Sequence, residues 1–278
     1  MNKKEITIDN YVKRKLTESH STVDELRIGV WAPISKLTKA STTYKNFVAN
    51  KNVRILQTPW GKVEIRNRIL TQIHKDIFDA IISNKSNIRT LSNGYVAVYF
   101  SLYNVLKILG KSTSNQKWLK DKIDEISDVR IKLINNDKDT ISFNILAKVA
   151  WSESQSMYGI IIDNDYLNFF LKSLTIKYSN RLYSIARIHD SLIKAIIRFF
   201  LTHNVEKYPF SIKLNKLLIS VGYPLESTRQ MSSAKTSVNK YTNQLKKFEI
   251  YYDKKSMIFS YKGVDYISFS NPIIVKDQ

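Results

Sequence analysis

The chain has 278 residues and no cysteine, which excludes disulfide bonds and thiolate metal sites. It has 44 Lys and Arg residues against 24 Asp and Glu residues, which gives a net charge of +20. Such a charge destabilises the folded chain by self-repulsion, so we expect an anionic partner. Nucleic acid is the first candidate and a membrane surface the second. The apolar runs fall far below the ~18 residues of a membrane span. The N-terminus lacks a signal peptide, so we expect a cytoplasmic protein.

The first 55 residues are polar and have few sustained apolar repeats, which predicts an arm or a small appended element. The segment NVRILQTPWGKVEIRN, residues 52–67, alternates polar and apolar residues around a Pro-Trp-Gly turn, as is typical of a β-hairpin. The rest of the chain divides into two segments, 56–175 and 176–278, that repeat one order of elements.

The first segment starts with three short elements. Thr71 is expected to cap a helix over residues 72–83, whose isoleucines fall on one face. Residues 95–100, YVAVYF, predict a short strand. Ser101 then begins a second helix, which Gly110 ends in the left-handed conformation.

A third helix is predicted near residues 115–126, with Thr113 as its cap and Gln116 closing a capping box. The following residues, 129–147, predict a hairpin whose tip holds Asp137, Lys138 and Asp139.

The sequence Gly-Lys-Ser-Thr at residues 110–113 also matches the second half of a phosphate-binding loop. That motif needs a glycine where this chain has Val105, and it must follow a strand, whereas a helical pattern precedes it here. A helix-turn-helix is therefore favoured over a nucleotide site.

The second segment repeats this order. Asp190 or Ser191 begins a helix, and YPFS, residues 208–211, predicts a short strand. The next helix, residues 212–221, is closed by Gly222.

A longer helix is predicted from Ser227 to Phe248, and residues 248–263 predict a closing hairpin. The apolar stripe of the long helix consists of Met231, Ala234, Val238, Tyr241 and Leu245.

Helix, strand, helix, turn, helix and hairpin is the order of a winged helix, and the chain repeats it. We therefore predict an α+β fold with two tandem winged-helix domains, residues 56–175 and 176–278, behind the N-terminal arm of residues 1–55. Two unrelated α+β units are the alternative.

In a helix-turn-helix the second helix lies in the major groove, where Arg suits guanine, Asn suits adenine and Lys neutralises phosphates. No acidic residue occurs from Arg229 through Lys247, although a solvated basic face is the alternative. The DNA-binding residues predicted on this helix are Arg229, Lys235, Thr236, Asn239, Lys240, Asn243, Lys246 and Lys247.

The corresponding helix of the first segment is basic only in its first turns, because Asp121, Asp124 and Glu125 follow. Its predicted DNA-binding residues are Lys111, Ser112, Thr113, Ser114, Asn115, Gln116, Lys117 and Lys120. At the hairpin tips, the residues expected to reach backbone phosphates are Lys138, Lys254 and Lys255.

Catalysis is poorly supported. The four histidines stand apart and form no His-x-His metal pair, and Asp163-Asn164-Asp165 is more typical of a turn than of a metal site. We predict no enzymatic activity, no cofactor and no metal. An ATPase that uses residues 110–113 or a nickase is the least favoured hypothesis.

Three stretches give a family resemblance: WGKVEIRNRILTQIHKDIFDAI, VYFSLYNVLKILGKSTSNQKWLKDKIDEI and SLIKAIIRFFLTHNVEKYPFSIKLNKLLISVG. With them, the chain from Trp60 to Leu245 resembles the TrfA-type plasmid replication initiators. The resemblance implies tandem winged-helix domains that bind repeated origin sequences in the bacterial cytoplasm. It further implies recruitment of the host initiator and helicase, and a balance between monomer and homodimer.

The resulting hypothesis is a replication initiator of a plasmid or similar replicon that binds double-stranded DNA sequence-specifically and spans no membrane. The alternative is a DNA-binding transcriptional repressor of the same fold.

Overall fold

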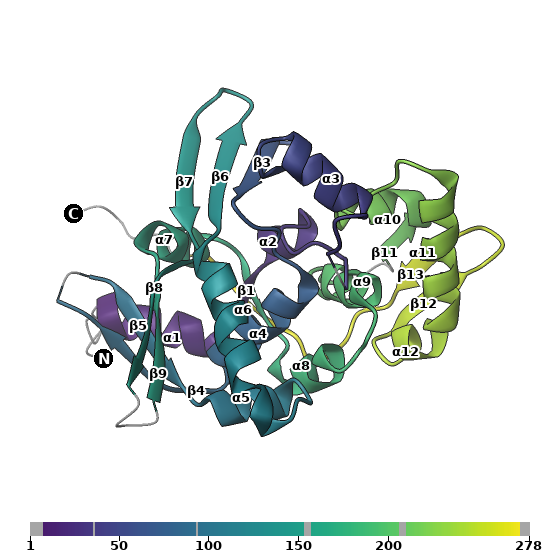
Figure 1. Cartoon of the computed structure of the whole chain (residues 1–278). Coiled ribbons are helices and arrows are strands. Elements are labelled where there is room, and N and C mark those ends of the chain that lie inside the picture. Colours follow the sequence, from purple (N-terminus) through teal and green to yellow (C-terminus); the bar gives the residue numbers. More distant parts are fainter. Residues whose placement is uncertain (1–7, 36, 93, 153–156, 206–209, 273–278) are drawn as a thin grey trace.

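The computed structural model describes residues 8–35, 37–92, 94–152, 157–205 and 210–272, which form a mixed α+β fold (Figure 1). Its strands form four antiparallel sheets with the orders β1-β10-β14, β2-β3-β6-β7, β4-β5-β9-β8 and β11-β13-β12.

The N-terminal segment is built into the core. Its elements are α1 (Ile8–Glu18), β1 (Ser21–Thr22), α2 (Val23–Arg27) and α3 (Thr42–Ala49). Val12, Leu16 and Trp31 are buried in the main hydrophobic cluster. The buried Lys15 ammonium donates to the carbonyls of Ser270 (2.9 Å) and Asn271 (2.6 Å) near the other end of the chain. The expectation of an arm or appended element is therefore wrong for these helices. Each helix is too short for its apolar residues to form a sustained repeat in the sequence.

The helices of the first segment lie as predicted. Thr71 caps α4 (Gln72–Ser83), and its backbone N–H donates to Nδ1 of His74 at 3.0 Å. After β4 (Lys85–Thr90) and β5 (Val96–Phe100), Ser101 caps α5 (Leu102–Ile108). Gly110 then adopts φ +66°, the left-handed conformation expected of a helix stop.

The third helix lies within one residue of its predicted bounds, but its start is capped differently. Ser112, rather than Thr113, accepts the capping hydrogen bond, and a short 3₁₀ turn over Thr113–Asn115 precedes α6 (Gln116–Ser127). The helix buries Leu119, Ile123 and Ile126, as its spacing predicted.

The hairpin predicted over residues 129–147 is confirmed, with Lys138 at its tip, but it does not pair with β5. Strands β6 (Arg130–Asn135) and β7 (Thr140–Asn144) continue the hairpin of β2 (Val53–Thr58) and β3 (Gly61–Arg66). The hairpin that pairs with β5 is instead formed by β8 (Leu146–Ser152) and β9 (Met157–Ile162). Strand pairing is a non-local choice between two adjacent hairpins, so the local pattern predicted the hairpin and its tip but not its partner strand.

The connection to the second segment consists of α7 (Asn164–Lys172), β10 (Thr175–Lys177) and α8 (Ser179–Ala186). Strand β10 pairs with β1 on one side and with β14 (Ser268–Ser270) on the other, so both ends of the chain meet there.

The second segment follows the predicted order with small shifts. Asp190 caps α9 (Ser191–Leu201), β11 covers Phe210–Lys213, and α10 covers Leu214–Ser220. The first two residues of the predicted strand, 208 and 209, lie outside the described residues. Gly222 has φ +69°, as expected of a helix stop.

The predicted long helix is divided in two. Helix α11 (Thr228–Lys240) ends at Tyr241, and α12 (Thr242–Lys246) follows. The Thr242 hydroxyl donates to the carbonyls of Val238 and Asn239, and such back-bonding bends helices. Strands β12 (Ile250–Asp253) and β13 (Ile258–Tyr261) then form the closing hairpin, and β13 also pairs with β11.

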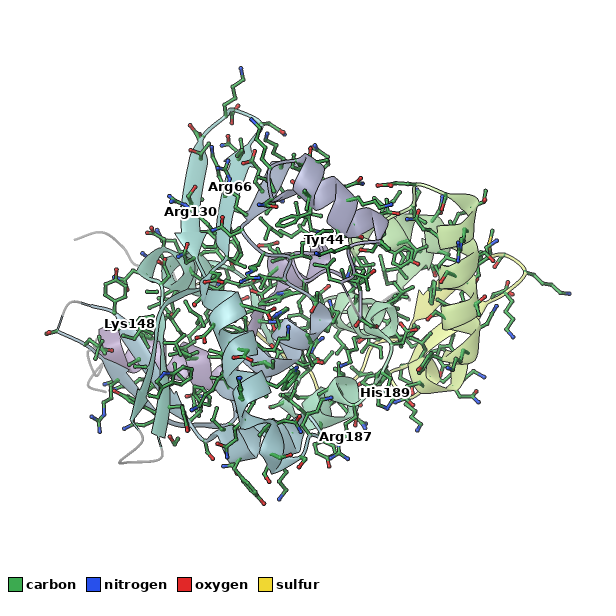
Figure 2. The ribbon with its side chains drawn as sticks, viewed as in Figure 1. Tyr44, Arg66, Arg130, Lys148, Arg187 and His189 are labelled. Atoms are coloured by element: carbon green, nitrogen blue, oxygen red, sulfur yellow. The ribbon has the colours of Figure 1, made fainter. Side chains whose placement is uncertain are left out.

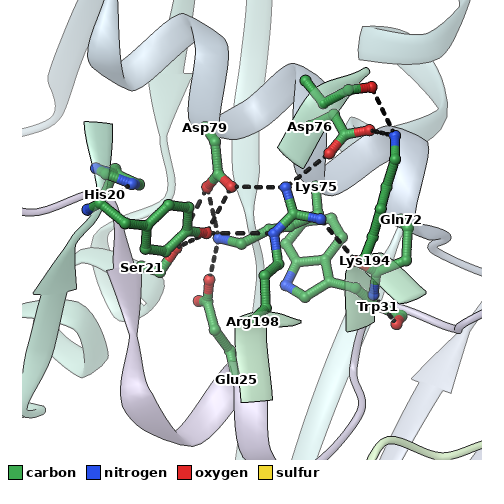
Figure 3. A network of polar contacts seen from close by, with 12 residues as sticks. His20, Ser21, Glu25, Trp31, Gln72, Lys75, Asp76, Asp79, Lys194 and Arg198 are labelled. Atoms are coloured by element: carbon green, nitrogen blue, oxygen red, sulfur yellow. Dashed lines mark hydrogen bonds and ion pairs between the residues drawn. The ribbon is translucent and has the colours of Figure 1, made fainter. Parts of the chain in front are cut away.

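A buried network of charges joins the two segments (Figure 3). Arg198 of α9 donates to Asp76 (2.6 Å) and Asp79 (3.1 Å) of α4, and Lys194 also pairs with Asp76. Lys75 pairs with Asp79 (2.9 Å) and with Glu25 of α2 (2.5 Å).

Three cations and three carboxylates thus compensate one another in this network, and all six side chains are buried. Because a buried charge needs a fixed partner, the network holds α2, α4 and α9 in one relative arrangement.

Candidate nucleic-acid interface

Helix α11 is positioned by a capping box at its start and by buried residues along one side. The Ser227 hydroxyl accepts from the backbone N–H of Gln230, and the Gln230 side chain accepts from that of Ser227 (2.9 Å). Ala234 and Val238 are completely buried, as is Leu245 in α12. The predicted apolar stripe is therefore confirmed, and it leaves the opposite side of the helix to solvent.

That opposite side carries a free basic surface. Its exposed residues are Arg229, Thr236, Asn239, Lys240, Asn243, Lys246 and Lys247, and Lys235 is half-buried. Within the described residues, none of these cations forms an ion pair with a carboxylate. A shallow depression of about 540 Å³ runs along α11 between Arg229 and Lys240 and is otherwise lined by serines and Thr236. The surface can therefore offer cations and hydrogen-bonding groups to an anionic partner without first breaking internal pairs.

Helix α11 is hydrogen-bonded to the start of α9 through Ser237. Ser237 donates to Asp190, whose other carboxylate oxygen accepts from the N–H groups of Leu192 (2.9 Å) and Ile193 (3.2 Å) at the start of α9. Because α9 also carries the buried Arg198, the orientation of α11 is linked to the network between the two segments.

The β12–β13 hairpin ends in an ordered turn. Asp253 accepts from the backbone N–H groups of Lys255 (3.0 Å) and Ser256 (3.3 Å) and from the Ser256 hydroxyl, which lowers the pKa of its carboxyl group. Lys254 and Lys255 at this tip are exposed. The tip therefore presents two cations on a fixed backbone beside α11 (Figure 1).

The first segment presents a smaller surface. Lys111, Ser112, Thr113, Ser114, Gln116 and Lys117 are exposed, whereas Asn115 and Lys120 are half-buried. The Lys120 ammonium lies 4.9 Å from the ring centroid of Trp151 and 4.8 Å from that of Tyr158, both on the β8–β9 hairpin. The Lys111 ammonium lies 5.4 Å from the ring of Trp118.

Of the three acidic residues that follow in α6, Glu125 interacts with neighbouring side chains, whereas Asp121 and Asp124 are exposed. Glu125 accepts from Lys122 (2.7 Å) and contacts Nε2 of His74 (2.9 Å), and these hydrogen bonds lower the pKa of Glu125 to about 2. The C-terminal half of α6 is therefore unfavourable for an anionic partner, which agrees with restricting the predicted contacts to its first turns.

Sequence reasoning missed several exposed cations (Figure 2). Lys148 is on the hairpin that pairs with β5, whereas the predicted Lys138 is on the tip of β6–β7 with φ +69°. Arg66 and Arg130 face each other across β3 and β6. The alternation in LAKVAWS, residues 146–152, was the available signal for the second hairpin.

The described residues contain neither a candidate metal site nor a candidate membrane span. Among the described residues, no three His, Asp or Glu side chains are grouped so that they could hold a metal ion. In the same part of the chain, no helix is both long and apolar enough to cross a membrane.

Comparisons with known proteins give little beyond this geometry. No protein-family model matches the chain, and no curated protein matches it. Among solved structures, the crystal structure of RctB domains 2-3 overlaps with a TM-score of 0.45 and 11% sequence identity, over 75% of this chain and 88% of that one. This overlap is too loose to support an assignment of fold or function.

Proposed function

We propose that the chain is a replication initiator that binds double-stranded DNA sequence-specifically through two tandem winged-helix units. The observation that carries the proposal is a repeated topology. In each unit a helix, a strand and a helix-turn-helix come before a hairpin whose last strand pairs with the earlier strand: β5 with β9, and β11 with β13. The first unit has additional strands, because β4 pairs with the other edge of β5 and the β6–β7 hairpin stands between α6 and β8.

The basic surface of α11 supports the same proposal. Its exposed Arg229 and Asn239 carry the side chains that pair with guanine and adenine, and Lys246 and Lys247 suit backbone phosphates. The free hairpin tip with Lys254 and Lys255 is placed to contact phosphates next to the groove.

The turn between α5 and α6 argues against an ATPase. Gly110 follows a helix and has the left-handed conformation of a helix stop, so residues 110–113 do not form the loop between a strand and a helix that cradles a nucleotide. The proposed function therefore includes no enzymatic step, no cofactor and no metal.

The finer parts of the proposal rest on the sequence resemblance alone. They are a plasmid-type replicon with repeated origin sites, recruitment of the host initiator and helicase, a homodimer as a second state, and the bacterial cytoplasm as location.

Selection from a randomised duplex library at two salt concentrations tests the proposal. An enriched asymmetric site, long enough for two groove helices, is the expected result. A palindromic site would favour a transcriptional repressor. Loss of all binding at the higher salt without enrichment would mean that the charge binds DNA nonspecifically, and the proposal would fail.

A further inference from the structure

A cleft of about 710 Å³ lies where the two winged-helix units meet. It is lined by the start of α4, by the turn between α5 and α6, and by the loop between α8 and α9. Of the lining residues, Lys111 is also a predicted DNA contact, whereas Arg187 and the cleft as a whole have no role assigned above.

The lining of the cleft has an excess of positive charge. Lys111, Lys122, Arg187 and Lys194 line it, against the single carboxylate of Glu125. Lys122 is neutralised by Glu125 and Lys194 by Asp76. Lys111 and Arg187 are exposed, and within the described residues neither pairs with a carboxylate. The cleft is therefore lined by two cations, Lys111 from one unit and Arg187 from the other, that have no carboxylate partner in the described part of the chain.

Contacts around the Gly110 turn bring these two cations close in the fold. A Cβ atom at Gly110 would lie 3.0 Å from Nε of Arg187, so the Arg187 side chain packs directly on the residue that precedes Lys111. The Arg187 guanidinium also stacks 3.7 Å from the ring centroid of Tyr183, which fixes its plane. Exposed His189, next to Arg187 in Figure 2, adds a further polar group to the lining.

We propose that this cleft binds a phosphate group between Arg187 and Lys111. A planar guanidinium binds two phosphate oxygens at once, and a lysine ammonium adds a point charge from another direction. The group comes either from the DNA backbone, as it passes between the two units, or from a free polyphosphate. Only the DNA source rests on the proposed function.

The variant Arg187→Gln tests the cleft, since it removes the charge at an exposed position outside both proposed groove helices. Arg181→Gln is the matched control. Arg181 is exposed on α8, which ends just before Arg187, and it lies 4.5 Å from the ring centroid of Tyr266, but it does not line the cleft. Thermal unfolding of both variants verifies that they are folded.

The first arm titrates sodium tripolyphosphate into the full chain at low salt in a calorimeter. A free polyphosphate as ligand predicts binding by the wild type and by Arg181→Gln, and at least about tenfold weaker binding by Arg187→Gln, as expected for loss of one charge-assisted contact. This arm needs no DNA, so it can succeed even if the proposed function fails.

The second arm measures the salt dependence of binding to a fixed duplex. A DNA phosphate in the cleft predicts that the slope of log K against log salt falls in magnitude by about 0.9 in Arg187→Gln and stays unchanged in Arg181→Gln. If Arg187→Gln alters neither the tripolyphosphate affinity nor the slope more than Arg181→Gln does, the proposal is wrong.

Discussion

The two proposed helix-turn-helix units differ in the surroundings of their second helices, α6 and α11. Helix α11 presents a basic surface whose cations form no ion pair with a carboxylate within the described residues, and the Lys240 ammonium lies 5.5 Å from the ring centroid of Tyr241. In α6, Lys120 is held over the aromatic rings of the β8–β9 hairpin, and Asp121 and Asp124 follow. The first turn of α6 is the only stretch of that helix that combines exposure with positive charge.

If the proposed function holds, this difference predicts different roles in DNA binding for the two units. We infer that the second unit reads base edges with α11, whereas the first contacts the backbone near its turn. The buried network around Arg198 would keep the two contacts at a constant spacing.

Breaking that network should have the largest effect. Arg198→Ala leaves Asp76 and Asp79 buried without one of their cations and should lower the free energy of unfolding by about 3–5 kcal/mol, as measured by urea denaturation. Arg14→Ala removes only the exposed pair with Glu18 and should change the free energy of unfolding far less, because water screens an exposed ion pair. Equal losses in the two variants would show that the network does not join the units.

The pH dependence of the free energy of unfolding provides the next comparison between the two units. Burial lowers the pKa of His20, beside the first unit, and of His203, in the second, to about 4. Since an unfolded histidine has a pKa near 6.5, protonation favours the unfolded chain. The stability that these neutral histidines contribute is complete above about pH 6.5 and is lost as the pH falls towards about 4, by at most about 1.4 kcal/mol per pH unit for each group.

His20→Gln and His203→Gln should each reduce this slope. If the two units unfold together, both substitutions reduce the slope of a single transition. Two transitions with separate pH responses would contradict the rigid connection.

A smaller effect is expected for single surface lysines. Lys246→Ala should weaken binding to all duplexes about equally and lower the salt slope by about 0.9, because it removes one phosphate contact. Lys117→Ala is the corresponding change in α6 and should do the same if the first unit contacts the backbone. No change in slope for Lys117→Ala would restrict DNA binding to the second unit.

Local chemistry made much of the fold predictable. Thr71, Ser101 and Asp190 cap the helices that the sequence placed after them, and Gly110 and Gly222 end helices in the left-handed conformation. These are interactions within a few residues, so the pattern of caps, glycines and apolar spacing is sufficient.

What failed depends on contacts far apart in the sequence. The choice between β6–β7 and β8–β9 as partner of β5 is made by pairing across the fold, and the N-terminal helices bury short apolar stretches that have no sustained period. Arg187 acquires its position only because α8 ends beside the Gly110 turn. The predicted DNA contacts stay predictions, although the structure leaves most of those side chains exposed.

The most direct test of the account is a parallel library selection with the wild type, Asn239→Ala and Asn115→Ala. Asn239 lies on the exposed basic side of α11, and Asn115 is half-buried at the start of α6. We predict that Asn239→Ala loses the preference at one base pair, by about 1–3 kcal/mol, while the rest of the site stays the same, and that Asn115→Ala keeps the wild-type site. An unchanged site in Asn239→Ala would contradict the placement of α11 in the major groove.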